Sequence, residues 1–446
     1  MLSSRLPKDL SPSPFFAELE RAKAESAPFI DMTVSSPVKT GLPVDLSAAV
    51  EEARKDFGCW NPDAAGWTSA REAVVEYYRE RGGNFTAGQI ILTASTSEAY
   101  SVLFKTFCDP GDVILTPMPG YPLLDTLVQL EHLECAPYFL KLKRNAKKKI
   151  PASAGMTSGA EFRFVLDSDS LLAAPEKAKI LLLVSPHNPT GHCVSREEWN
   201  EAVHFCEENN LILVVDEVFG DYGFSEKISR TWKYVLGNDK ACHPERNEVE
   251  PIYETSQLVD LVELGSKEQD LWDAGENDLI NLPEDGPKCP IFWLNGLSKA
   301  VGSPQLKLGW MAFYAPRERF EEIRAALEFV EDAYLSVSAP AQALGTALLK
   351  QSAAYESRVK GRLLQNWQTL REAFPAKYCP EVLGGWYAVV RLGEDDEELT
   401  LRLLKEKHVL VQPGFFFDFD EDGWVVVSLL QEPATFKDAV QRMQSL

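Results

Sequence analysis

The stretch Leu294–Trp310 reads LNGLSKAVGSPQLKLGW and places one lysine, Lys299, in a turn that contains glycine and serine. The run Ile291–Leu294 at its start is apolar, as expected for a buried β-strand. A lysine buried behind such a strand is costly unless its charge is removed or paired. A desolvated amine has a lowered pKa and can form a Schiff base with a carbonyl compound. An ordinary surface lysine in a loop also fits these residues, so the rest of the chain has to decide.

Length and charge set the first limits. With 446 residues, the chain can form one large core and a smaller domain, or two to three domains. The formal net charge of −22 argues against nucleic acid or an anionic membrane as a principal partner. No apolar run approaches the roughly 20 residues that span a bilayer, and residues 1–16 contain no apolar signal core. We therefore expect a cytoplasmic protein with neither a nucleic-acid nor a membrane partner.

The cysteines and histidines do not predict a metal site. The eight cysteines are scattered without CxxC pairs, and the six histidines are equally dispersed. His187 and His192 flank one turn, but no further ligands of suitable spacing accompany them. The sequence therefore predicts neither a bound metal nor a disulfide framework.

From residue 89 onward, segments typical of strands alternate with segments typical of helices. The strands are expected at 89–93, 113–117, 179–185, 211–216, 291–294 and 311–315, and the intervening helices at 97–108, 123–133 and 197–209. Such alternation of apolar strands with helices predicts an α/β fold, in which a large domain has a mainly parallel central sheet flanked by helices. Ligands in such folds collect at the carboxyl ends of the strands.

The end of the chain is typical of a smaller α+β domain. Its strands are expected at 385–391, 409–412 and 424–429, and its helices at 395–406 and 435–443. Residues 1–45 are rich in proline and serine and are expected to form an arm that packs with this domain. We therefore predict an N-terminal arm (1–45), a large domain (46–335) and a small C-terminal domain (336–446).

Two stretches interrupt the alternation of strands and helices. A basic run within 141–159 is most simply interpreted as a solvated surface excursion. The stretch from about 225 to 289 is rich in acidic residues and contains isolated aromatic residues such as Trp232. It is too long for a plain connection, so we expect an acidic insertion there, either a subdomain or a flap.

Polar residues lie where several of the expected strands end. Thr93–Ser97 joins a strand to a helix, and hydroxyl and N–H groups at a helix N-terminus suit a phosphate. Tyr121 lies in a proline-rich turn and can stack on a flat ring, and Asn188 offers an amide donor at the tip of another turn. Asp216 ends an apolar strand and needs a cationic partner, which a protonated pyridine nitrogen provides. Singly, each also has an ordinary explanation in capping or packing, as does Lys299.

In their order and spacing these residues resemble the class I/II aminotransferases, a family of fold-type I enzymes that depend on pyridoxal 5'-phosphate (PLP). The matching segments are LTASTSEAY, CDPGDVILTPMPGYP, VSPHNPTG, VVDEVFGDY and LSKAVGSPQLKLGW, followed by GGWYAVV and VLVQPGFFF. The resemblance covers residues 30–440 apart from the two interruptions. It implies a PLP-dependent aminotransferase that acts on an amino donor and a keto acid, and a homodimer with its active site at the subunit interface.

The resemblance also implies roles for individual residues. Lys299 would form the Schiff base with PLP and then move the substrate's Cα proton, and Asp216 would keep the pyridine nitrogen protonated. Asn188 would donate to the phenolic oxygen of PLP, and Tyr121 would stack on its ring. The remaining predicted cofactor-binding residues are Ser95, Thr96 and Ser97, which would cradle the phosphate, together with Ser298 and Lys307.

Four positions depart from the family's pattern. Phe219 replaces a tyrosine that donates to the phenolic oxygen, and Lys307 replaces a phosphate-binding arginine, which keeps the charge but loses the bidentate fork. Trp60 aligns with a tyrosine that reaches the partner subunit's phosphate. Val426 takes the place of the arginine that binds the substrate's α-carboxylate. Either another cation, for which Lys39 is a candidate, replaces that arginine, or the substrate lacks the carboxylate; Lys39 and Trp60 are thus the predicted substrate-side residues.

These motifs leave three functions open. The first is a PLP-dependent aminotransferase that works by a ping-pong mechanism with an unidentified donor. The second is a PLP-dependent lyase that acts at Cβ or at a C–S bond, because the same electron sink and lysine serve both reactions. The third is a PLP-binding regulatory protein without turnover. Lys299, Asp216 and Asn188 favour an enzyme, and we expect the aminotransferase.

Overall fold

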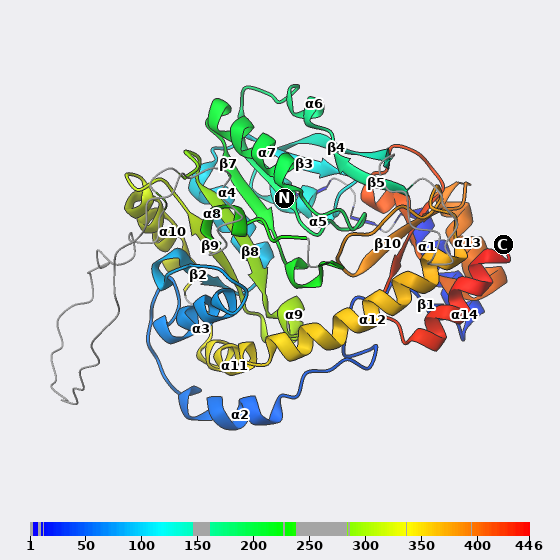
Figure 1. The fold of residues 1–446 in the computed structure, drawn as a ribbon, viewed down its shortest axis with the longest axis horizontal. Helices are drawn as coiled ribbons and strands as arrows, with labels where there is room; N and C mark the ends of the chain where they lie inside the picture. Colours follow the sequence, from blue (N-terminus) through cyan, green and yellow to red (C-terminus); the bar gives the residue numbers. More distant parts are fainter. Residues whose placement is uncertain are drawn as a thin grey trace, which may run out of the picture.

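The computed structural model of the protein describes residues 3–7, 10–11, 13–145, 161–225, 228–237, 283, 286–335, 337–393 and 395–446. A mixed β-sheet forms the centre of its larger half (Figure 1). Its strands are β2 (Ile90–Thr93), β3 (Val113–Met118), β4 (Glu134–Asn145), β5 (Glu161–Leu166), β6 (Ala178–Val184), β7 (Ile212–Asp216), β8 (Ile291–Gly296) and β9 (Gly309–Tyr314). Within the described residues these eight strands lie in the order β2-β9-β8-β7-β6-β3-β4-β5.

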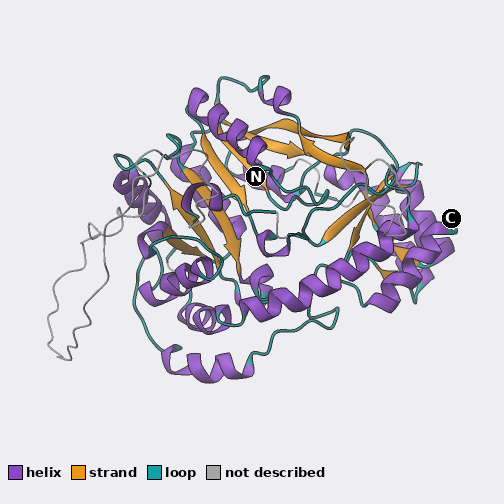
Figure 2. Ribbon diagram, viewed as in Figure 1, coloured by secondary structure: helices purple, strands orange, loops and turns teal. Residues whose placement is uncertain are grey.

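Six of the eight described strands run in the same direction, and β9 and β5 run opposite to them. Every residue of β8 and β9 is buried, which explains why these strands are apolar throughout rather than alternating. Helices cover the sheet on both sides (Figure 2). They include α3 (Thr68–Arg79), α4 (Thr96–Phe107), α5 (Leu123–Leu130), α7 (Arg196–Asn209) and α10 (Phe320–Tyr334). The predicted α/β class with a mainly parallel sheet is confirmed.

A smaller sheet lies at the other end of the molecule (Figure 1). It contains β10 (Tyr387–Arg391), β12 (Gln412–Pro413) and β13 (Trp424–Ser428), with β13 in the middle and antiparallel to both neighbours. The helices around it are α12 (Ser352–Ala373), α13 (Asp396–Lys407) and α14 (Pro433–Gln444). One end of α12 packs against α14 and another part contacts α9 (Leu297–Ala300), so this long helix joins the two ends of the molecule.

The N-terminal segment packs onto the C-terminal part of the chain. Strand β1 (Ile30–Asp31) pairs in parallel with β11 (Val409–Leu410), and α1 (Pro14–Ser26) packs against α13. A separate apolar cluster fixes this contact; its buried members are Phe15, Leu19, Ala22, Leu404 and Leu410. The remaining α-helices are α2 (Ser47–Ala53), α6 (Ser168–Leu171), α8 (Lys233–Leu236) and α11 (Ala339–Leu349). The domain limits at 45/46 and 335/336 stay predictions.

One expectation about the interruptions differs from the structure, and another is untested. Residues 141–145 are not an excursion but the end of β4, where Leu140 to Asn145 pair with β5 in antiparallel orientation. Leu140 is buried, whereas Lys141, Leu142, Lys143 and Arg144 are all exposed in this part of the strand. Trp232, expected in the acidic insertion, is fully buried against Tyr78. The stretches 146–160 and 238–282 lie outside the described residues, and with them the bulk of both interruptions.

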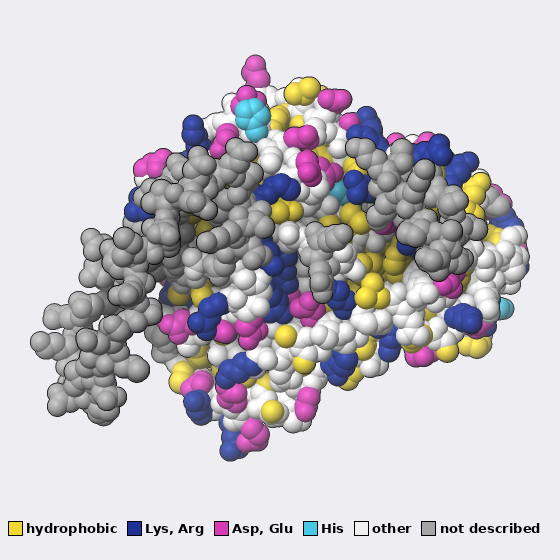
Figure 3. Space-filling model, in the orientation of Figure 1, with side chains coloured by type: hydrophobic (Ala, Val, Ile, Leu, Met, Phe, Trp, Pro, Cys, Tyr) yellow, Lys and Arg dark blue, Asp and Glu magenta, His cyan; other side chains and the backbone are white. Residues whose placement is uncertain are grey.

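The surface carries both signs of charge. On the face drawn in Figure 3, acidic and basic side chains are interspersed between patches of apolar residues. The net charge of −22 is therefore not gathered into one acidic surface on this face. In the described part of the chain, no helix combines the length and the apolar character needed to cross a bilayer.

Candidate active site

A pocket of about 270 Å³ opens at the carboxyl ends of the parallel strands. All nine residues predicted to bind the cofactor line it, although they come from five separate segments of the chain. They are Ser95, Thr96, Ser97, Tyr121, Asn188, Asp216, Ser298, Lys299 and Lys307. The fold brings them together because successive parallel strands end at one edge of the sheet.

One end of the pocket is suited to an anion. Ser95 is the N-cap of α4, where its hydroxyl accepts a hydrogen bond from the Glu98 N–H at 3.2 Å. The unpaired N–H groups of the first turn of α4 give this end a positive potential. A side chain at Gly309 would place its Cβ 3.0 Å from the backbone of Ser95, so glycine allows β9 to approach this helix end. Lys307 precedes β9 and adds a full positive charge. Together these groups fit a phosphate.

Asp216 lies at the end of β7 and is held by two donors. The Tyr100 hydroxyl donates to Oδ2 at 2.7 Å, and the Val218 N–H donates to Oδ1 at 3.0 Å. Burial raises the pKa of Asp216, whereas both hydrogen bonds and the positive charge of Lys299 oppose that rise. The carboxylate therefore has a fixed position. A cationic ligand would lower the free-energy cost of its buried negative charge further.

Lys299 extends from α9 toward aromatic rings. Its Nζ lies 4.6 Å from the centroid of the Trp386 ring and 5.4 Å from that of Phe219. Burial lowers the pKa of Lys299 to about 8, and the nearby Asp216 acts against this shift. Because a large fraction of the amine is then unprotonated near pH 8, Lys299 is suited to attack a carbonyl and to carry a proton.

The position of Phe219 explains what the loss of a tyrosine changes. Its ring is buried and packs against Trp386 and Tyr387 at centroid distances of 5.5 and 6.0 Å. Phe219 lines the pocket without a hydroxyl group, so it cannot donate a hydrogen bond to a ligand there. Its contribution is an apolar wall beside Lys299.

The middle of the pocket fits a polar aromatic ring. The Oδ1 atom of Asn188 is buried and has no hydrogen-bond partner among the described residues. Such an atom costs free energy unless a ligand or water pairs with it. Tyr121 lies at the same pocket with 47% of its surface exposed, and burial of the remainder together with Asp216 raises its pKa. With the anion end and Asp216, the pocket fits the phosphate and the ring nitrogen of PLP; Asn188 can donate to the phenolic oxygen only from its Nδ2, because its Oδ1 is an acceptor.

The other end of the pocket is formed by residues that the sequence did not single out. Ser35, from the segment after β1, lines it together with Tyr387 of β10. Burial raises the pKa of Tyr387 to about 12, against the effect of a hydrogen bond with Ser35. Part of the pocket lining is apolar and comes from α5; the members of this α5 wall are Leu123, Leu124 and Leu127. Tyr100 was also missed, although its i+4 spacing from Thr96 could have placed it on the same face of α4.

The two predicted substrate-side residues lie elsewhere in this single chain. Neither Lys39 nor Trp60 lines the pocket, and 79% of the Trp60 surface is exposed. Val426 is fully buried in β13, opposite Val389 of β10. Among the described residues that line the pocket, the cationic side chains are Lys299 and Lys307.

A model of the aminotransferase class I and II family matches residues 45–443. The glutamate-pyruvate aminotransferase AlaA of Haemophilus influenzae is 24% identical, over 93% of this chain and 90% of the relative. An alanine aminotransferase of Mycobacterium tuberculosis is also 24% identical, over 85% of this chain and 76% of the relative.

Solved structures show the same fold. An alanine aminotransferase from Pyrococcus furiosus superimposes with a TM-score of 0.75 at 19% identity, covering 100% of this chain and 99% of the other. An aspartate aminotransferase from Thermotoga maritima gives a TM-score of 0.72 at 19% identity, with coverage of 100% and 99%. The family match spans nearly the whole chain, and the activity that it carries is amino-group transfer. The chain therefore belongs to the class I and II aminotransferase family.

Proposed function

We propose that the pocket binds PLP, and that the protein uses it to move an amino group from a small-molecule donor to a keto acid in two successive half-reactions. The observation that carries this proposal is the convergence of the nine predicted residues on one pocket. Ser95, Thr96 and Ser97 with Lys307 would hold the phosphate, and Asp216 would face the ring nitrogen. Asn188, Tyr121 and Ser298 would complete the site.

PLP supplies an electron sink when it is bound, which stabilises negative charge at the carbon that bears the donor's amino group. The protein contributes the proton transfer and the orientation. Lys299 can accept a proton at Nζ and return it, because burial brings its pKa to about 8, close to the operating pH. Tyr100 and Val218 keep the Asp216 carboxylate aimed at one point. The leucines of α5 give the pocket an apolar surface.

The chemical class of the amino donor is a separate part of this proposal. Val426, which the resemblance aligns with the carboxylate-binding arginine of the family, is fully buried and does not line the pocket; the described cations that line it, Lys299 and Lys307, are both assigned to the cofactor. We therefore propose a donor that does not depend on an arginine of β13, and whose body packs on the leucines of α5. An amine without an α-carboxylate meets that description. A carboxylate held by Lys39 from the N-terminal turn is the competing arrangement.

A homodimer and a cytoplasmic location are also proposed. The homodimer is supported by large apolar side chains that are exposed in the single chain; they include Trp60, Phe329 and Leu335. Light scattering on purified protein would give the mass directly, and a mass of one chain would exclude the dimer. The location rests on the sequence, and cell fractionation would test it.

The first test of the proposal is the absorbance of the purified protein, because bound PLP is yellow. Purified protein should be yellow or become yellow with added PLP, and Lys299→Ala should lose the covalent attachment while the fold is kept. The holoenzyme is then mixed with a matched pair of donors, phenylethylamine and L-phenylalanine, which differ only in the carboxylate. Loss of the yellow form, with recovery by a keto acid, demonstrates transamination.

Three outcomes contradict parts of the proposal. Release of pyruvate and ammonia from a donor with a Cβ leaving group would assign a lyase. If the protein is yellow but no tested donor alters its absorbance spectrum, a regulatory protein without turnover would be favoured. A preference for L-phenylalanine on the order of 10²-fold, as expected for a paired carboxylate, would exclude the carboxylate-free donor; loss of that preference in Lys39→Ala would then assign the clamp to Lys39.

A further inference from the structure

The turn that carries Lys299 cannot hold its own position. Helix α9 has only four residues, and so short a helix is unstable unless its neighbours fix it. Hydrogen bonds from outside do so. One is a backbone bond from the Leu297 N–H to the Leu308 oxygen at 3.0 Å, and two others involve tyrosine hydroxyls. The Tyr222 hydroxyl donates to the backbone oxygen of Lys299 at 2.6 Å. On the strand side, Asn295 donates from Nδ2 to the Tyr77 hydroxyl at 3.2 Å, while its Oδ1 accepts the Gly296 N–H at 2.7 Å.

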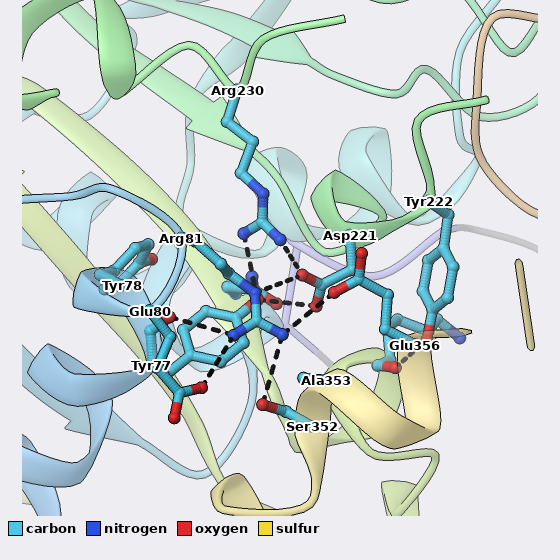
Figure 4. A network of polar contacts seen from close by, with 12 residues as sticks. Tyr77, Tyr78, Glu80, Arg81, Asp221, Tyr222, Arg230, Ser352, Ala353 and Glu356 are labelled. Atoms are coloured by element: carbon cyan, nitrogen blue, oxygen red, sulfur yellow. Dashed lines mark hydrogen bonds and ion pairs between the residues drawn. The ribbon is translucent and has the colours of Figure 1, made fainter. Parts of the chain in front are cut away.

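Both tyrosines are connected to the same carboxylate, that of Asp221, one by a hydrogen bond and the other along the chain. The Tyr77 hydroxyl donates to its Oδ2 at 2.7 Å, and Tyr222 is the next residue in the same short turn, η4 (Gly220–Tyr222). Only 3% of the Asp221 surface is exposed. Arg81 donates to its Oδ1 from Nε at 2.9 Å, and Arg230 pairs with the same oxygen. Figure 4 shows the two guanidinium groups converging on Asp221 from different sides.

The cluster also reaches α12. Arg81 donates from its second terminal nitrogen to Ser352 at 3.3 Å and to Glu356 at 3.1 Å, both in the first turns of that helix (Figure 4). Its guanidinium carbon lies 4.0 Å from the centroid of the Tyr77 ring. Arg81 also pairs with the more exposed Glu80 at 3.7 Å. The two arginines thus neutralise the buried Asp221 carboxylate and hydrogen-bond to it. None of these residues lines the pocket, so the cluster is not a ligand site.

We propose that Asp221 is a positioning residue for Lys299, acting through Tyr77 and Tyr222 on the two ends of the turn between β8 and α9. The proposal rests on the proposed role of Lys299 in binding PLP and moving a proton. A displacement of a reacting group by 1 Å can cost on the order of 10²-fold in rate. The role is geometric, because burial and Asp216, not the arginines, determine the pKa of Lys299.

Tyr222→Phe is the main test, since it removes one hydroxyl and keeps the ring. Tyr314→Phe is its matched control: Tyr314 is also buried and donates to a backbone oxygen, that of Pro287 at 2.9 Å, but it lies at the opposite end of β8. Two quantities are measured. One is amide hydrogen exchange of peptide 296–303 in cofactor-free protein, where Ser303 donates to Leu297. The other is kcat and KM of the holoenzyme at saturating PLP.

Tyr222→Phe should raise exchange in this peptide about fivefold, the factor expected for one lost hydrogen bond. Its kcat should fall about tenfold with KM and PLP affinity unchanged, because misplacement affects the reacting amine and not the binding of ligands. The pH midpoint of kcat should stay where it is in the wild type. Tyr314→Phe should change neither exchange in 296–303 nor kcat.

Asp221→Asn and Tyr77→Phe extend the test to the centre of the cluster. Both should repeat the pattern of Tyr222→Phe, and if Asp221→Asn does not fold, the two tyrosine variants decide. Unchanged exchange in 296–303, or faster exchange with an unchanged kcat, would overturn the proposal. A wild-type protein that binds no PLP would instead overturn the proposed function, and the exchange experiment separates the two failures because it needs no cofactor.

Discussion

The two ends of the pocket are built in different ways. At the proposed cofactor end, charged and hydroxyl groups stand at the carboxyl ends of strands in the large sheet, and Asp216 is held there by hydrogen bonds from Tyr100 and Val218. At the other end, Ser35 and Tyr387 come from the N-terminal segment and the small sheet, and the α5 wall is apolar. Ser35 and Tyr387 are separated by more than 350 positions in the chain.

This difference separates two kinds of requirement. A phosphate and a pyridine nitrogen need charges at fixed places, and the edge of a parallel sheet provides such places. In the proposed function, the donor would be bound by the shape and polarity of segments outside that sheet. Changes at the cofactor end should therefore affect chemistry and PLP binding, whereas changes at the other end should affect only the choice of donor.

The largest effect is expected from Asp216→Asn, which removes the charge and keeps the shape. Loss of a fixed charge aimed at the reacting system typically costs on the order of 10²- to 10³-fold in kcat. Stopped-flow absorbance of the first half-reaction would measure it. The matched control is Glu217→Gln, because Glu217 is buried beside Asp216 but accepts hydrogen bonds from Thr231 instead of lining the pocket. Equal losses in both variants would mean that burial, not the position of Asp216, matters.

A pH titration of Lys299 in cofactor-free protein should show the second largest effect. Burial lowers its pKa to about 8, so the reactive unprotonated amine increases as the pH rises through about 8 instead of 10.5. At pH 8 acylation of Lys299 should then be about 10²-fold faster than that of a lysine with an ordinary pKa. Mass spectrometry of labelled peptides measures this rate. In Asp216→Asn the midpoint should move to lower pH, because Asp216 is the charge that raises the pKa of Lys299.

Lys307→Ala tests the anion end of the pocket. A hydrogen bond to a charged group contributes about 1.5–3 kcal/mol, so the Kd for PLP should rise roughly tenfold to a hundredfold. Lys307→Arg should keep the wild-type Kd or lower it, because a guanidinium can bind a phosphate through two hydrogen bonds. Lys350→Ala removes a surface lysine that pairs with Glu52, and it should leave the Kd unchanged. Fluorescence titration with PLP would compare all three variants.

The sequence singled out nine residues that the structure brings to one pocket, and their roles toward PLP stay predictions. Lys299, Asp216 and Asn188 each follow an apolar strand, and residues at strand ends of a parallel sheet meet whatever the details of the helices between them. The same logic predicted the strands themselves. Their apolar runs are continuous because helices cover both faces of the sheet.

The donor end and the support of Lys299 could not be predicted in this way. Ser35 and Tyr387 meet only because β1 pairs with β11 and the small sheet docks near the pocket, which no local pattern specifies. Asp221 and Arg81 are 140 positions apart, and each alone reads as a surface charge. The strand end at 141–145 was missed because its lysines suggested solvent, although one face of a strand is often solvated.

Tyr387→Phe should have the smallest effect and is the sharpest test of the division between the two ends. It removes the hydroxyl that pairs with Ser35 while the ring keeps its contact with Phe219. The KM of the donor should rise about fivefold, the factor expected for one neutral hydrogen bond, while the Kd for PLP stays unchanged. The control is Tyr138→Phe, which removes a buried hydroxyl bonded to Leu182 outside the pocket. A weaker PLP affinity in Tyr387→Phe would show that the small sheet also holds the cofactor.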